Sequence, residues 1–253
     1  MKLQVFYHLY IPDNDYAMYW IWWVDSQLGI IKDSYLSEHA QINMCITMPK
    51  TWNHFYDVLF TEPFNNNTCT FEKTVVDYIT ITYPFVNILE VRDTSEPNIY
   101  EGHTLKKLYE FALTDTENSF LLYFHSKGSS FFNRNPIMMK TWKDTCENAL
   151  IKNWTNCIQP LFETDVVGVA GTCNPNFENM KSLTCNFWWS KSSYIRTLPE
   201  PIDSSRYLLL YAEQSSYHPG GENYRYAFER WIHLSNPKLT FVNTFDQQRF
   251  YKA

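Results

Sequence analysis

The sequence predicts an α/β protein with a mainly parallel sheet flanked by helices. Short apolar runs alternate with longer amphipathic segments through the first half of the chain, as expected for strands joined by helical crossovers. Three predicted strands are followed at once by a polar turn, at residues 12–15, 92–98 and 125–130. Because the carboxyl ends of parallel strands share one edge of a sheet, these turns predict a ligand site at that edge.

The composition is that of a folded chain with a substantial core. Hydrophobic residues make up 45% of the 253 residues and charged residues 19%. The net charge of -6 gives no general basic surface, so nucleic acid is not an expected partner. We expect one domain over 1–253, with a nucleotide-binding half at 1–130 and an acceptor half at 131–253.

Export and membrane insertion are not expected. The apolar run at 17–24 is too short to cross a bilayer, which needs about 20 residues, and no secretory signal is visible. The 6 cysteines lie apart without a CxxC pair, which predicts reduced core thiols rather than a zinc site. We therefore expect a cytoplasmic protein without a membrane span.

Each element of the first half follows from its periodicity. The segment 19–39 places apolar residues at spacings of three and four, which predicts an amphipathic helix. The segment 71–82 fits a helix despite its β-branched residues, whereas 52–60 fits no single pattern and 62–70 is a loop. The remaining elements are strands at 2–11, 42–48, 85–91 and 120–124, and a helix at 103–115.

The second half continues the pattern with fewer strands. It contains a helix at 136–154, a strand at 165–170, a polar loop at 171–182, a mixed segment at 183–198, a helix at 222–235 and a strand at 239–243.

The turn His125-Ser126-Lys127-Gly128 closes an apolar strand. Lys127 supplies a fixed positive charge suited to a phosphate, and His125 can donate, accept or bind a metal. Gly128 lets the backbone turn sharply or approach a ligand. A solvated turn with an ordinary surface lysine explains the same residues equally well.

Two further segments carry groups suited to a sugar site. Asn186 can bond to hydroxyls, and Trp188 and Trp189 can stack on sugar faces, although a buried aromatic strand is the plainer interpretation. Glu229 lies among aromatic residues and could act as a general base, or simply pair with Arg225 at i,i+4 spacing.

Polar residues around the third strand are also candidates. Arg92 and Asp93 follow that strand, and Glu101 and His103 open the next helix. Each could contact a nucleotide or a sugar, or merely cap a helix.

Together and in this order, these pieces resemble a group of glycosyltransferases with a GT-A-like fold, found in large DNA viruses and bacteria. The group includes chlorovirus glycosyltransferase domains and, more distantly, rhamnan-synthesis proteins. The shared landmarks are Glu101-Gly102-x-Thr104-Leu105, Tyr123 to Gly128, Trp142, Asn186 to Trp189 with Tyr194 and Leu198, and Arg225-Tyr226 with Glu229 and Trp231.

The resemblance implies a mixed, mainly parallel GT-A-like (Rossmann-like) sheet. It also implies transfer of a sugar from a nucleotide-diphosphate sugar, a UDP-sugar in the first instance, to a glycan, a glycoconjugate or another hydroxyl acceptor. By resemblance, Glu229 is the base and the reaction inverts the anomeric centre. The segment Asn186 to Trp189, with Asn186, Trp188 and Trp189 as its polar and stacking groups, would frame the sugar or acceptor. The first strand end, Tyr7 to Tyr10, would flank the nucleotide base. A viral member would work in the host cytoplasm.

The chain departs from the family pattern at one important position. Most GT-A enzymes carry an Asp-x-Asp motif for a divalent metal where this chain has His125-Ser126-Lys127. His125 and Lys127 would then hold the diphosphate, and the lysine would neutralise its departing charge in place of the metal. The departure leaves the need for a metal cofactor open, and His125, with Asp93, is the candidate ligand of Mn²⁺.

Two other classes of function stay open. One is a non-catalytic carbohydrate- or nucleotide-binding module on the same fold. The other is a different α/β enzyme, such as a phosphoryl or nucleotidyl transferase. The sequence contains no GxxxxGK[ST] loop, no GxGxxG and no Asp-rich two-metal cluster, which disfavours the second class.

Overall fold

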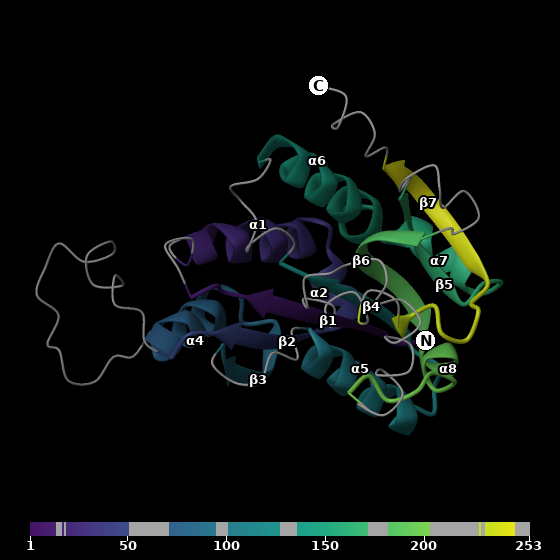
Figure 1. The fold of residues 1–253 in the computed structure, drawn as a ribbon, viewed down its shortest axis with the longest axis horizontal. Helices are drawn as coiled ribbons and strands as arrows, with labels where there is room; N and C mark the ends of the chain where they lie inside the picture. The colour runs from purple at the N-terminus through teal and green to yellow at the C-terminus, as the bar shows by residue number, and fades with distance from the viewer. Residues whose placement is uncertain are drawn as a thin grey trace, which may run out of the picture.

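The computed structural model describes residues 1–13, 17, 19–50, 71–94, 101–126, 136–171, 182–202, 228 and 231–245. Within these residues, one seven-stranded sheet draws on both halves of the chain, with the strand order β3-β2-β1-β4-β6-β5-β7. Helices lie on both sides of the sheet (Figure 1). The predicted α/β class with a mixed, mainly parallel sheet is confirmed.

The first four strands are parallel to one another. β1 (Leu3–Tyr10) lies between β2 (Ala40–Met48) and β4 (Phe120–His125), and β3 (Val86–Asp93) pairs with β2. Since all four run the same way, their carboxyl ends share one edge of the sheet. The crossovers contain the helices α1 (Trp20–Asp33), α2 (Leu36–His39), α4 (Phe71–Thr82) and α5 (Gly102–Thr114).

The second half adds three strands, one of them reversed. β6 is antiparallel to both β4 and β5, whereas β5 and β7 are parallel. The first residues of β6 therefore lie at the edge where β4 ends. The elements in order are α6 (Pro136–Glu147), the π-helical segment η2 (Asn148–Lys152), α7 (Thr155–Leu161), β5 (Val166–Gly171), β6 (Ser182–Lys191), α8 (Ser192–Ile195) and β7 (Leu239–Phe245).

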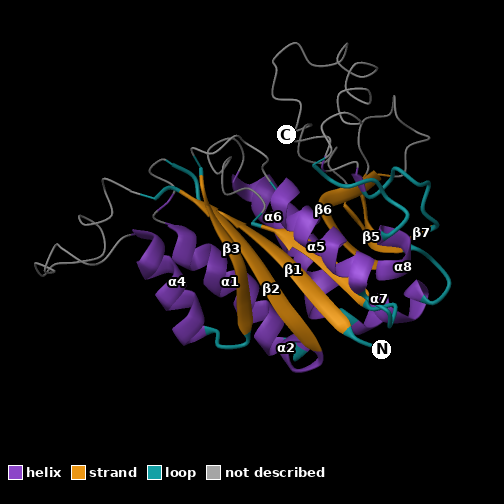
Figure 2. Ribbon diagram, turned by 90° about the horizontal axis from the view of Figure 1, so that it is seen from below, coloured by secondary structure: helices purple, strands orange, loops and turns teal. Residues whose placement is uncertain are grey.

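The two faces of the sheet bury two separate cores. Alternation along β1 sends Val5, Tyr7 and Leu9 into the larger core, under α1, α4 and α6, while Phe6 enters the smaller core, under α5 and α8. The twisted sheet between these layers is seen in Figure 2. Fully burying a leucine such as Leu122 in the larger core stabilises the fold by about 1.5–3 kcal/mol.

Two predicted helices are interrupted in the structure. The helix predicted over 19–39 breaks after α1, because Tyr35 adopts a left-handed conformation with φ 60°. The helix predicted over 136–154 loosens into η2 before α7 begins. The helix predicted over 222–235 lies largely outside the described residues, although Phe228 and Trp231 within it are helical. The helix over 71–82 is confirmed as α4.

Candidate functional site

The candidate site lies where the four parallel strands end, the edge at which open α/β sheets bind ligands. His125 is the last residue of β4 and lies beside His8 of β1. The next residue, Ser126, ties the two strands together: its main-chain N–H donates to the His8 carbonyl at 3.0 Å, and its hydroxyl accepts from the Tyr10 N–H at 2.8 Å. The position at which the chain leaves β4 is therefore fixed by β1.

A buried carboxylate at the start of α5 forms the centre of this edge. Glu101 is 6% exposed and precedes the helix, so its carboxylate lies near the partial positive charge of the helix amino terminus. Its Oε1 accepts a hydrogen bond from the Asn186 Nδ2 at 2.6 Å. Its Oε2 lies 3.8 Å from the His125 Nε2, an electrostatic contact longer than a hydrogen bond. Glu101, His125 and Asn186 thus come together from α5, β4 and β6.

Asn186 reaches this point because β6 is irregular. Trp188 pairs with Gly168 of β5, but Leu183 already pairs with Ala170, so the intervening residues of β6 bulge out of register. Asn186 takes a left-handed backbone conformation with φ 52°, which asparagine tolerates better than most residues. Its Oδ1 accepts from the Trp188 indole N–H at 3.0 Å, which orients the amide toward Glu101. Strained residues of this kind cluster at functional sites.

A pair of histidines lies on the same face of the sheet. The His8 Nδ1 is 2.9 Å from the Thr104 hydroxyl, and the His103 Nε2 is 3.3 Å from the Thr47 hydroxyl. The two rings meet edge to face with centroids 5.0 Å apart. Burial, and then the neighbouring His103, lower the pKa of His8 well below its usual 6.5. His8 lies within the strand end Tyr7 to Tyr10 that the resemblance placed beside the nucleotide base, although no role of its own was predicted for it; the available signal was a histidine inside an otherwise apolar strand.

This arrangement can bind hydroxyl and phosphate oxygens. A carboxylate accepts hydrogen bonds, whereas an imidazole can donate them or carry a positive charge. The Glu101 carboxylate is already oriented by Asn186, so it would lose little freedom on binding a ligand. Such preorganised polar groups at a strand edge are what a binding or catalytic site requires.

Arg92 and Asp93 lie on the opposite side of this edge, at the end of β3. The Arg92 Nε is 3.8 Å from a Glu90 carboxylate oxygen, and Asp93 lies 3.8 Å from the Lys50 ammonium. Strands β2 and β1 separate β3 from β4, which puts Asp93 and His125 about 14 Å apart at the usual strand spacing. The structure therefore does not place these two residues side by side, and their pairing at Mn²⁺ stays a prediction.

No group of three or more His, Cys, Asp or Glu side chains suited to a metal ion occurs in the part of the chain that the structure describes. The prediction of His125 as a Mn²⁺ ligand therefore needs partners from elsewhere in the chain or from the ligand.

Tyr7, the residue predicted to flank the nucleotide base, points away from this edge. Its ring lies in the larger core and stacks on Phe124 with centroids 4.4 Å apart. Burial, and then the charge of Glu147, raise the pKa of the Tyr7 hydroxyl well above 10.0. The structure thus places Tyr7 within the packing of the sheet, three residues before the strand end.

Trp188 and Trp189 are both fully buried, on opposite faces of β6. Trp188 packs in the smaller core, 5.2 Å from the Tyr123 ring, while the Trp189 indole N–H donates to the Leu150 carbonyl at 2.8 Å. This placement agrees with the alternative interpretation of the segment as an aromatic core strand. Lys127 and Glu229, the predicted phosphate-binding residue and base, lie outside the described residues.

The chain belongs to a protein family through residues 6–251, which match the family described as Domain of unknown function (DUF8361). No curated protein matches the chain in sequence. No helix within the described ranges is long and apolar enough to span a bilayer.

Several solved structures are similar in fold at low sequence identity. One is a protein described as a nucleotide-diphospho-sugar transferase from Desulfovibrio desulfuricans G20, with TM-score 0.42, 8% identity and coverage of 97% of this chain and 82% of that chain. Another is 4-diphosphocytidyl-2C-methyl-D-erythritol synthase, with TM-score 0.41, 12% identity and coverage of 96% and 88%. HddC from Yersinia pseudotuberculosis has TM-score 0.39, 11% identity and coverage of 100% and 98%.

Proposed function

We propose that this chain is a glycosyltransferase that moves a sugar from a nucleotide-diphosphate sugar, a UDP-sugar in the first instance, to a hydroxyl of a glycan or glycoconjugate. The observation that carries the proposal is the convergence of Glu101, His125 and Asn186 at the carboxyl edge of the parallel strands. Ligands of open α/β sheets bind at such an edge. The ordered motifs of the sequence then favour a sugar nucleotide over other ligands.

In this proposal, cationic residues bind the diphosphate, and polar or acidic residues bind the sugar and the acceptor. His125 and Lys127 hold the diphosphate, because cationic donors bind phosphate oxygens and stabilise the charge that develops on the leaving group. The Glu101 carboxylate accepts hydrogen bonds from the sugar hydroxyls, and the Asn186 amide donates to them. Glu229 removes the proton from the acceptor hydroxyl, and the acceptor oxygen attacks the anomeric carbon as the bond to the diphosphate breaks, with inversion.

A divalent ion remains part of the test. If Mn²⁺ takes part, His125 and the Glu101 carboxylate beside it are the described residues that would hold it, together with phosphate oxygens of the donor. The ion would neutralise charge on the diphosphate. Without it, Lys127 would carry that role alone.

The experiment is a thermal-shift and calorimetric screen of the protein against UDP, GDP, dTDP and their sugars, with and without Mn²⁺. A ligand at 100 times its dissociation constant stabilises the folded state by about 2.7 kcal/mol, which such a screen detects. The ligand that binds is then used in a transfer assay with Glu229→Gln, which we expect to keep donor affinity and lose turnover. Binding without transfer by the unmodified protein would favour the binding module instead. Silence across the panel would overturn the proposal.

A further inference from the structure

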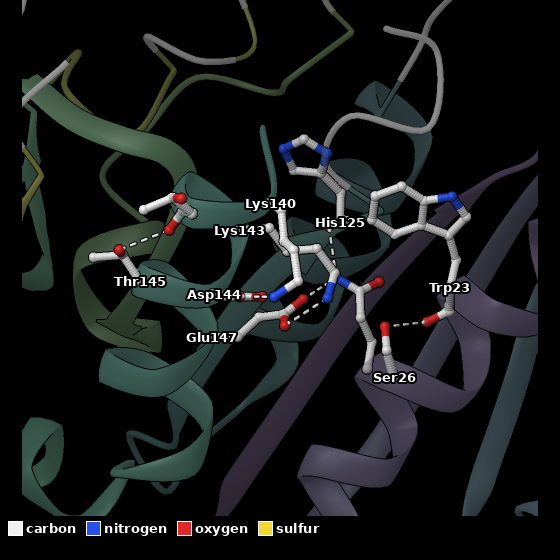
Figure 3. A network of polar contacts seen from close by, with 10 residues as sticks. Trp23, Ser26, His125, Lys140, Lys143, Asp144, Thr145 and Glu147 are labelled. Carbon is white, nitrogen blue, oxygen red and sulfur yellow. Dashed lines mark hydrogen bonds and ion pairs between the residues drawn. The ribbon is translucent and has the colours of Figure 1, made fainter. Parts of the chain in front are cut away.

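A second polar network lies on the other side of β4, under the candidate site. It joins α1, α6 and the end of β4 through Gln27, Lys143 and Glu147 (Figure 3). All three side chains are buried: Gln27 is 0% exposed, Lys143 3% and Glu147 1%. Charged residues are almost never this buried unless they are paired, and the proposed reaction uses none of the three.

The network begins with an ion pair within α6. The Lys143 ammonium donates to the Glu147 Oε2 at 2.8 Å, across one helical turn. The rings of Trp22 and Trp23 from α1 cover the ammonium, with centroids 5.3 and 5.5 Å away. Burial raises the pKa of the Glu147 carboxyl, and the nearby Lys143 opposes that rise. The lysine therefore helps to keep Glu147 ionised inside the protein.

The ionised carboxylate determines how the Gln27 amide points. The Gln27 Nε2 donates to the Glu147 Oε1 at 2.8 Å and to the main-chain carbonyl of His125 at 3.3 Å. Both partners are acceptors, so the reversed amide would set its oxygen against two oxygens. The Gln27 Oε1 has no partner in the described structure, which shows that the amide is held by its nitrogen alone.

His125 is thus held from both faces of the sheet. Its side chain faces Glu101 on the α5 side, and its carbonyl accepts from Gln27 on the α1 side. The peptide group that contains this carbonyl also contains the Ser126 N–H, which donates to the His8 carbonyl at 3.0 Å. The His125–Ser126 peptide is therefore hydrogen-bonded at both its C=O and its N–H, which fixes the backbone at the end of β4.

We propose that Lys143, Glu147 and Gln27 are positioning residues for the candidate site: the ion pair fixes the Gln27 amide, which fixes the His125–Ser126 peptide and with it the His125 side chain. The effect of these residues on binding of a sugar-nucleotide donor rests on the proposed function. Their effect on the backbone at the end of β4 does not. None of the three residues needs to touch a ligand.

Helix α6 provides its own control. Lys140 and Asp144 form a second i,i+4 ion pair on the same helix, but this pair is exposed, with side chains 67% and 39% accessible. The test variant is Lys143→Met with Glu147→Met, and the control is Lys140→Met with Asp144→Asn. Both variants remove one positive and one negative charge from α6. Replacing a buried ion pair by apolar side chains of similar volume is often neutral for stability.

The first readout needs no ligand. Amide hydrogen exchange by NMR is compared at Ser126 and at Leu122, which lies in the middle of β4. We expect exchange at Ser126 to accelerate about tenfold in the buried-pair variant while Leu122 is unchanged, because only the strand end loses its support. The control variant should match the unmodified protein at both amides. Equal acceleration at both, or none at Ser126, would overturn the proposal.

The second readout uses UDP and uridine as probes in calorimetry. We expect the buried-pair variant to lose about tenfold in UDP affinity and none in uridine affinity, because His125 is proposed to contact the diphosphate and not the nucleoside. Failure of UDP to bind the unmodified protein would count against the proposed function, and the exchange data would still decide the positioning role. If the buried-pair variant does not fold, Gln27→Met removes the hydrogen bond to the His125 carbonyl directly and must give the same local acceleration at Ser126.

Discussion

Two buried carboxylates flank His125 from opposite faces of the sheet, and the protein holds them in different ways. Glu147, 1% exposed, lies between two helices and is neutralised by the Lys143 ammonium. Glu101, 6% exposed, lies at the strand edge beside a neutral amide and a histidine. Glu147 is thus compensated by a cation inside the core, whereas Glu101 lies at the sheet edge where we propose that a ligand binds.

The largest effect is expected from removing the interior carboxylate alone. Glu147→Leu should lower the free energy of unfolding by about 3–5 kcal/mol, because it leaves the Lys143 charge buried and unpaired. Urea denaturation measures this loss. Adding Lys143→Met to the same protein should restore most of it. A loss of unfolding free energy below about 1 kcal/mol for Glu147→Leu would mean that the Lys143 ammonium finds another partner. The ion pair would then not be what fixes the Gln27 amide.

The next effect is a pH dependence on the Glu101 side of the sheet. Because the folded-state pKa of His8 is lowered, the unfolded chain binds a proton that the folded chain does not. Stability should therefore fall as the pH drops below about 6.5, by up to about 1.4 kcal/mol per pH unit. The raised pKa of Glu147 acts with the opposite sign, since a folded state that holds a proton more readily gains stability as the pH falls.

Urea denaturation between about pH 5 and pH 7 measures the His8 contribution. His8→Gln should remove this part of the slope. If the variant keeps the full slope, the histidine is protonated in the folded state as well, and another group causes the dependence.

A smaller effect should isolate the backbone strain at Asn186. Its φ of 52° suits glycine and disfavours alanine, so Asn186→Ala should be less stable than Asn186→Gly by about 1 kcal/mol. Both variants lose the amide that orients Glu101, so the difference between them reports the backbone alone. If Asn186→Ala is instead more stable than Asn186→Gly, residue 186 can leave the left-handed conformation. The bulge in β6 would then not be required by the surrounding structure.

The sequence predicted the four strands of the first half and the edge where they end, but not the breaks in the helices over 19–39 and 136–154 or the contacts across the edge. The apolar run at 120–124 and the polar turns located the strand ends correctly, because period and turn chemistry are local properties. Side chains alternate along β1, so that Tyr7 lies in the larger core and His8 faces α5. The sequence could not show which of the two faces each helix covers. Asn186 was chosen for its chemistry, but its meeting with Glu101 depends on a bulge that no local pattern announces.

Gln27 shows a signal that was present in the sequence and left unused. It occupies the apolar stripe of α1, between Trp23 and Ile31, where a polar side chain must find partners inside the protein. The stripe predicted the helix correctly. The partner, Glu147, lies 120 residues further along the chain, so only the tertiary structure could supply it.

The smallest effect is expected from neutralising the edge carboxylate. Glu101→Gln keeps an oxygen that can accept from Asn186 and loses the charge that faces His125 at 3.8 Å, so its stability should change by about 1 kcal/mol or less. The same denaturation series that measures Glu147→Leu measures this variant. A loss close to that of Glu147→Leu would make Glu101 a structural charge like its counterpart. A small loss, together with weakened binding of the nucleotide found in the ligand screen, would assign the two carboxylates to different tasks, one to the fold and one to the ligand.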